Sequence, residues 1–175
     1  MEPIRIQTKM TLKEYTDLIY VLTYKKWWLR IFTAMGVLML LVSLIYYTRL
    51  FPNLFPKDYS PYMNIILGIT IVMLIPVSTY YSARKNFLSN PRMSETTTYE
   101  FSGNVLKING ESFNTEMDLE NSFKIKELKN WFLIYHSRLT ANLIPKTRMT
   151  TDEVSKLRTH LRSINTDVQL NDQQN

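Results

Sequence analysis

The chain has 175 residues, no cysteine and a formal net charge of +6. Without cysteine it cannot hold a disulfide framework, a thiolate nucleophile or a cysteine metal site. Half of the excess charge lies within residues 1–30, and no block of Lys and Arg interleaved with aromatic residues indicates a nucleic-acid partner.

The first 28 residues predict a short strand followed by a helix. Ile4 and Ile6 alternate with polar residues, as in a strand. Thr11 and Glu14 have the spacing of a capping box, and apolar residues then recur at helical spacing as far as Trp28. Two positions are open for this helix, along a membrane surface or docked on a soluble domain, and the sequence favours docking.

Two apolar stretches follow, Ile31–Leu50 and Tyr62–Tyr81, each 20 residues long. This is the length that a helix needs to cross a hydrocarbon core ~30 Å thick. Aromatic residues lie at the ends of both stretches, as in interfacial belts. We therefore predict a transmembrane hairpin over residues 29–83, with spans 29–50 and 62–83. A soluble hairpin is the weaker alternative, because helices that are apolar on all sides need a larger protein to cover them.

Basic residues flank this hairpin on both sides, whereas the loop between the two stretches has few charges. Lys and Arg concentrate in short cytoplasmic flanks, so we expect a multi-pass protein of the cell (inner) membrane with both termini in the cytoplasm. The same side chains are candidate contacts for anionic lipid head groups, although setting the orientation is the simpler role. They are Lys25, Lys26, Arg30, Arg84, Lys85 and Arg92.

Beyond residue 94 the apolar residues alternate with polar ones, which is typical of strands. Asn109-Gly110 has the composition of a two-residue hairpin turn, and Trp131–Tyr135 is a continuous apolar run. We predict six or seven short antiparallel strands within residues 94–165, as a cytoplasmic domain, and a flexible polar tail over 166–175.

A second capping box, Thr150 to Glu153, opens a helix whose apolar residues lie along one stripe. A helix that closes the open end of a small barrel is the arrangement of a pleckstrin-homology-like (PH-like) domain. The stripe consists of Val154, Leu157, Leu161 and Ile164.

The order of these elements resembles the YcxB-like family, bacterial membrane proteins of largely uncharacterised function. Two hydrophobic helices precede the strands, and Leu143-Ile-Pro-Lys146 precedes the capped final helix; the similarity covers roughly Tyr99–Arg162. The resemblance implies a helical hairpin and a PH-like domain, and it transfers no catalytic residues.

The titratable residues form no recognisable catalytic or metal site. His136 and His160 are the only histidines, lack the His-Glu-x-x-His pattern and are expected at the surface. Glu116, Asp118 and Glu120 share a strand face, where a solvated face paired with lysines is favoured over a Ca²⁺ or Mg²⁺ site. We therefore expect no enzyme, no cofactor and no metal.

The expected fold class is membrane α+β, with a two-helix transmembrane hairpin and a small antiparallel β domain closed by a C-terminal helix. The expected function is that of a membrane-anchored cytoplasmic interaction module that binds a peptide, a partner protein or anionic lipid. The alternatives are an accessory subunit of a membrane transport or signalling complex and, less favoured, a small enzyme with an unrecognised site. The oligomeric state is not indicated.

Overall fold

The structure, a computed structural model, describes residues 3–51, 53–56, 58–164 and 166–170. The chain forms two compact units, which we call the helical unit and the β unit. The helical unit is Leu12–Ser89, and the β unit combines Met1–Thr11 with Asn90–Asn175. The helical unit is therefore inserted, in sequence, after the first strand of the β unit.

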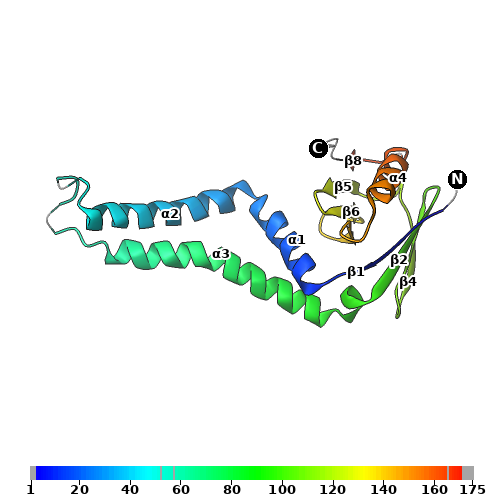
Figure 1. Ribbon diagram of the computed structural model, residues 1–175, viewed down its shortest axis with the longest axis horizontal. Coiled ribbons are helices and arrows are strands. Elements are labelled where there is room, and N and C mark those ends of the chain that lie inside the picture. The colour runs from blue at the N-terminus through cyan, green and yellow to red at the C-terminus, as the bar shows by residue number, and fades with distance from the viewer. Residues whose placement is uncertain (1–2, 52, 57, 165, 171–175) are drawn as a thin grey trace. The chain divides into compact units, whose positions relative to one another are not determined.

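The described residues of the helical unit form the helices α1 (Leu12–Tyr24), α2 (Trp27–Thr48) and α3 (Tyr62–Ser89). Helices α2 and α3 lie side by side as a hairpin (Figure 1). A hairpin of two long apolar helices is confirmed, and α3 continues past the predicted end of the second span, residue 83, to Ser89.

Both hairpin helices are long and apolar enough to cross a membrane. Within their most apolar windows only 11% and 17% of the residues are buried inside the protein, so most of the apolar side chains face outward. Leu38 is 60% exposed and Ile66 59% exposed. Helices that are apolar on all sides are typical of a membrane span or of the core of a larger protein.

A glycine on each helix sets the close approach of α2 and α3. A Cβ added at Gly36 would lie 2.8 Å from Cγ2 of Ile71. A Cβ added at Gly68 would lie 2.8 Å from Cδ2 of Leu40 and 3.0 Å from the carbonyl oxygen of Gly36. The last contact involves backbone, which no rotamer change can relieve. Small residues at a crossing permit the van der Waals packing that associates helices in lipid.

Helix α1 packs on the second half of α3. The ring centroids of Tyr15 and Phe87 are 5.9 Å apart, and the hydroxyl of Tyr20 donates to the carbonyl oxygen of Pro76 at 2.8 Å. Leu18, between the two tyrosines, is fully buried. The sequence favoured docking on the soluble domain, whereas the docking partner seen in the structure is α3.

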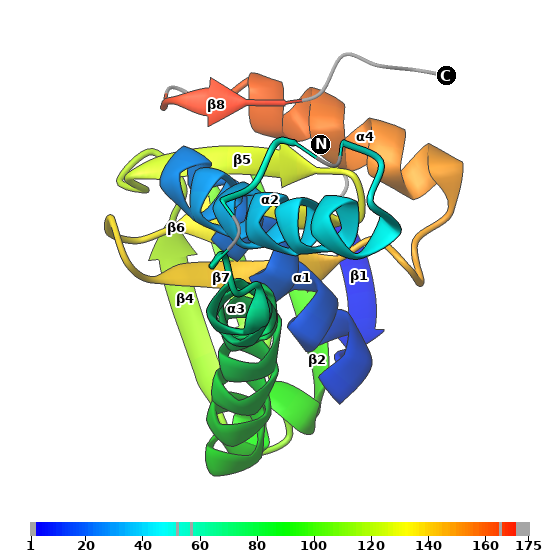
Figure 2. The ribbon, with the colours of Figure 1, turned by 90° about the vertical axis from the view of Figure 1, so that its left-hand side faces the viewer.

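In its described residues the β unit contains two four-stranded sheets and one α-helix, α4 (Thr151–Arg162). The first sheet has the order β1-β2-β3-β4 and is antiparallel. The second has the order β7-β6-β5-β8, in which only β8 is parallel to its neighbour. Figure 2 shows α4 and β8 beside β5. The strands are β1 (Ile4–Lys9), β2 (Thr96–Ser102), β3 (Val105–Asn109), β4 (Asn114–Asp118), β5 (Lys124–Leu128), β6 (Trp131–Tyr135), β7 (Ala141–Pro145) and β8 (Val168–Gln169).

Strand β1 is an outer strand of the first sheet, although the whole helical unit separates it in sequence from its partner, β2. The register runs from Ile4 opposite Phe101 to Lys9 opposite Thr96. Ile6 is 3% exposed and belongs to the core of the β unit. The predicted domain, 94–165, therefore left out its first strand.

The C-terminal end also differs from the prediction of a flexible tail over 166–175. Val168 lies opposite Ile125 in the second sheet, and Val168 and Leu170 pack against the core. The partial burial of these two apolar residues holds 168–170 against the domain. Residues 171–175 lie outside the described part of the chain.

The tight turn of the first sheet is not at Asn109-Gly110. Asn109 pairs with Asn114, and the loop between them is closed by the Gly110 N–H, which donates to the Phe113 carbonyl at 2.8 Å. The two-residue turn joins β2 to β3 instead, where Gly103 has a φ of 55°. Glycine adopts this left-handed conformation without a steric penalty.

Helix α4 begins with the predicted capping box and covers the core. The Thr150 hydroxyl accepts from the Glu153 N–H at 3.2 Å, and the Glu153 carboxylate accepts from the Thr150 N–H at 2.7 Å. Leu157 and Leu161 are fully buried. The predicted apolar stripe is confirmed as the face that closes the β unit.

Replacing Ile6 by Ala is expected to destabilise the β unit by about 2–5 kcal/mol, the usual cost of truncating a buried Ile. Thermal unfolding of the full-length protein in detergent measures this loss. The fluorescence of Trp131, which is 5% exposed in the β unit, follows the unfolding of that unit. Trp27 and Trp28 are changed to Phe in all the proteins compared, so that Trp131 is the only tryptophan. The exposed neighbour Gln7→Ala is the control. An unchanged melting temperature in Ile6→Ala would contradict the role of β1 in the core.

Candidate functional site

The six basic residues proposed as head-group contacts are divided between the two units, and all six are exposed. The helical unit carries five: two at the break between α1 and α2, one in the first turn of α2, and two in the last part of α3. The sixth belongs to η1 (Pro91–Ser94), a 3-10 helix of the β unit. In this order they are Lys25, Lys26, Arg30, Arg84, Lys85 and Arg92.

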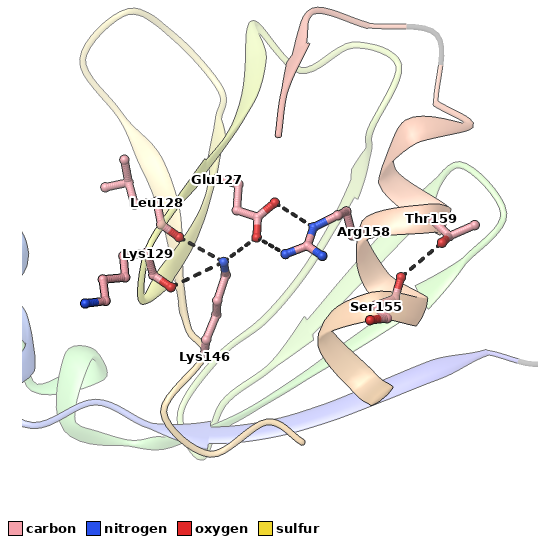
Figure 3. A network of polar contacts seen from close by, with 7 residues as sticks. All are labelled: Glu127, Leu128, Lys129, Lys146, Ser155, Arg158 and Thr159. Carbon is pink, nitrogen blue, oxygen red and sulfur yellow. Dashed lines mark hydrogen bonds and ion pairs between the residues drawn. The ribbon is translucent and has the colours of Figure 1, made fainter. Parts of the chain in front are cut away.

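The β unit contains a buried ion triad, which we define as Glu127, Lys146 and Arg158 (Figure 3). The Glu127 side chain, on β5, is 1% exposed, and those of Lys146 and Arg158 are 11% and 19% exposed. Arg158, on α4, binds the carboxylate with two nitrogens, Nε at 2.9 Å and Nη2 at 2.6 Å. Lys146, after β7, donates to the same carboxylate and to the Leu128 carbonyl at 2.8 Å. The triad thus connects α4 to two strands of the second sheet.

Charge and burial oppose each other within the ion triad. Burial alone would raise the pKa of Glu127, but the hydrogen bonds from Arg158 and Lys146 outweigh it, and the pKa lies below its ordinary value. Burial lowers the pKa of Lys146, and the hydrogen bond to Glu127 offsets only part of this effect. The ammonium of Lys146 also lies 4.5 Å from the ring centroid of Phe132, a favourable cation–π distance.

Sequence reasoning missed Glu127, although the pattern of β5 contains the signal. Ile125 and Glu127 are two residues apart, so they share one face of the strand, and Ile125 is fully buried. A carboxylate on a core-facing position predicts a basic partner. In the sequence, Lys146 stands out only as the last residue of Leu143-Ile-Pro-Lys146. In the structure Pro145 ends β7, and Lys146 turns to the buried carboxylate.

A cavity of about 280 Å³ lies in the β unit, and we call it the junction pocket. The wall of the pocket includes Met10, just before the chain enters the helical unit, and Asn90, just after the chain leaves it. The outer strands β4 and β7 of the two sheets also contribute. The lining residues are Thr8, Met10, Asn90, Arg92, Met93, Glu95, Thr97, Tyr99, Ile108, Phe113, Thr115, Ala141, Asn142 and Leu143.

Polar groups in the junction pocket are held in place by neighbours. The Tyr99 hydroxyl donates to the Leu143 carbonyl at 3.2 Å, and burial raises the pKa of Tyr99 to about 12, so the hydroxyl stays protonated at neutral pH. Glu95 accepts from the hydroxyl and N–H of Ser112 at 2.6 and 2.9 Å, and these bonds lower its pKa. Arg92 lies 5.6 Å from the ring centroid of Phe113. The pocket can therefore offer both hydrogen bonds and apolar contact to a ligand.

The acidic strand residues have partners of their own. Glu116 lies 3.7 Å from Lys107, Asp118 accepts from the Asn121 amide at 2.9 Å, and Glu120 accepts from an Asn104 amide at 2.6 Å. Among the residues that the structure describes, no group of three or more His, Cys, Asp and Glu side chains could hold a metal ion.

His160 differs from the surface position predicted for it. It is half-buried on α4, with its ring centroid 6.1 Å from that of Phe101 on β2. Its Nε2 atom is buried and has no hydrogen-bond partner among the described residues. His160 is adjacent to the core-facing Leu161, which brings the ring over the edge of the core. His136 is exposed, as expected.

Replacing Glu127 by Gln is expected to cost about 3–5 kcal/mol at pH 7, because two partly buried cations lose their counter-charge. The folded-state pKa of Glu127 is depressed, so its contribution is complete above the ordinary pKa of about 4.3 and disappears as the pH falls through the folded-state value. The difference in melting temperature between wild type and variant should therefore shrink below about pH 4. Trp131 fluorescence, in the background with Trp27 and Trp28 replaced, follows the unfolding.

The control for this experiment is Glu116→Gln, whose side chain is 60% exposed and whose ion pair is worth about 0–1 kcal/mol. A difference between wild type and Glu127→Gln that stays constant from pH 7 to pH 3 would contradict the electrostatic role of Glu127.

The sequence model of the YcxB-like protein family matches residues 101–161, from the end of β2 into α4. The comparison with curated proteins found no match, and neither did the comparison with solved structures. All three members of the ion triad lie within the matched segment. The family resemblance expected from the sequence is confirmed over this segment: residues 101–161 of the β unit are similar to the YcxB-like protein family.

Proposed function

We propose that this protein is a membrane-anchored interaction module. The hairpin of α2 and α3 spans the inner membrane, and the β unit lies in the cytoplasm and binds its partner in the junction pocket. The observation that carries the proposal is the insertion of two outward-facing apolar helices between the paired strands β1 and β2.

The pairing of β1 with β2 supports an even number of membrane crossings. Both strands belong to one sheet, so the chain must return to the side of the membrane from which it left. Two spans satisfy this requirement, and one span does not. The basic flanks then favour the cytoplasm as that side, because Lys and Arg are retained there.

We further propose that the β unit is a PH-like domain. In support, seven strands form two antiparallel sheets in chain order, and a C-terminal helix follows. The parallel strand β8 is an addition to that plan. The domain has a core of its own, including Phe101 and Leu157, and is large enough to fold around it.

The junction pocket favours an extended peptide of a partner protein as the ligand. Its wall includes the outer strands β4 and β7, and outer strands carry backbone groups that can pair with another chain. The charged side chains in the wall are one arginine, Arg92, and one glutamate, Glu95. A pocket with balanced charge is a weaker site for anionic lipid than for a peptide. We regard this role as non-catalytic.

The orientation predicts the outcome of reporter fusions. Green fluorescent protein joined before Ile4 or after Asn175 is expected to fluoresce, and alkaline phosphatase inserted after Asn53, between α2 and α3, is expected to be active. A result that places the two termini on opposite sides of the membrane would overturn the two-span anchor. Both termini outside would overturn the cytoplasmic orientation alone.

The ligand is tested by a photo-crosslinking amino acid at Asn142, in the wall of the junction pocket. A discrete crosslinked protein is expected in intact cells, and Thr115→Trp, which fills the pocket from β4, should remove it. The control position is Leu139, 94% exposed in the turn before β7. Equal products at both positions would contradict a specific site, and a crosslink to lipid alone would replace the peptide by a lipid ligand.

A further inference from the structure

An open groove of about 500 Å³ runs along α2 on the surface of the helical unit. Tyr24 and Arg30 lie at one end, and Thr33, Ala34, Val37 and Leu41 continue it along the helix. All of these residues belong to one compact unit.

The body of the groove is apolar, although Thr33 contributes to it. The Thr33 hydroxyl donates to the Leu29 carbonyl of its own helix at 2.9 Å, so it needs no partner inside the groove. Ala34 is smaller than its neighbours Val37 and Leu41, and its short side chain leaves the hollow between them. This surface therefore suits a hydrocarbon chain.

Charge is confined to one end of the groove. Arg30 is exposed, and within the described part of the chain it forms no ion pair. Lys25 and Lys26 precede α2 at the same end. The ligand that complements this pattern has a negatively charged head and an apolar tail.

The length of the groove agrees with such a ligand. From Arg30 to Leu41 the helix rises about 16 Å, at ~1.5 Å per residue. This is about half of a hydrocarbon core ~30 Å thick, the depth of a single leaflet. An acyl chain that starts beside Arg30 would therefore end near the middle of the bilayer.

We propose that this groove binds one anionic phospholipid, with its phosphate at the guanidinium of Arg30 and an acyl chain along α2 to Leu41. The inference rests on the proposed membrane span of α2. It specifies the class of lipid and the place of the contact. A diffuse attraction between the basic flanks and anionic lipid would specify no such place.

The native tryptophans report on this site. Trp27 and Trp28 lie one turn from Arg30 and are 67% and 53% exposed, whereas Trp131 is 5% exposed in the β unit. The protein is reconstituted in vesicles of phosphatidylcholine and phosphatidylglycerol, and a spin label on the acyl chain of one lipid or the other quenches the fluorescence. Labelled phosphatidylglycerol is expected to quench more strongly, with a local preference of up to about fivefold for one cation at an anionic head group.

Two pairs of variants separate the groove from the general charge of the flanks. Arg30→Gln should abolish the preference, whereas Arg84→Gln, the same change on α3, should retain it. Ala34→Phe should also abolish it, because it fills the groove while Arg30 remains, whereas Leu44→Phe, outside the groove, should not.

The outcomes distinguish this inference from the proposed function. If neither labelled lipid quenches the fluorescence, α2 does not lie in the bilayer and the membrane anchor is wrong. If both lipids quench equally, the anchor stands and the anionic lipid site is overturned. Equal losses in Arg30→Gln and Arg84→Gln would likewise overturn the site, because diffuse attraction then accounts for the preference.

Discussion

The pairing of β1 with β2 is the constraint on which the rest of the structure depends. It requires the two ends of the inserted segment to lie close together, since Lys9 is opposite Thr96. The helical unit meets the same requirement through its own packing, because the rings of Tyr15 and Phe87, near its two ends, are 5.9 Å apart. Each unit therefore brings its own joining ends close together.

Within the β unit, apolar burial and the ion triad have different roles. Residues such as Leu157 and Leu161 provide the non-directional burial that holds α4 on the core. The bidentate contact between Arg158 and Glu127 has a defined geometry, which adds directional specificity to the contact between α4 and β5. A buried ion pair is weak support for stability by itself, because desolvation costs as much as the attraction gains.

The features that could be predicted from the sequence are those encoded by neighbouring residues. An apolar stretch of 20 residues predicts each helix of the hairpin, and the alternation of apolar and polar residues predicts a strand. The spacing of Thr150 and Glu153 predicts where α4 begins. The partner of β1 could not be predicted, because it is a long-range pairing and the helical unit lies between. Glu127 was missed and His160 was wrongly placed at the surface, because the surroundings of both depend on how α4 meets the sheets. The junction pocket was missed for the same reason, since β1, η1, β4 and β7 all contribute to it.

The interrupted sheet has a consequence for how the protein is made. Strand β1 leaves the ribosome first, but its partner follows only after the 78 residues from Leu12 to Ser89, which take roughly 4–16 s at typical rates of synthesis. In the proposed membrane arrangement, a chain that inserted one helix instead of two would leave β1 and β2 on opposite sides of the bilayer. Its sheet could never close, and the edge of β2 and the core beneath it would stay open to proteases. Completion of the β unit would then report that the hairpin had been inserted correctly, and only correctly inserted chains would persist.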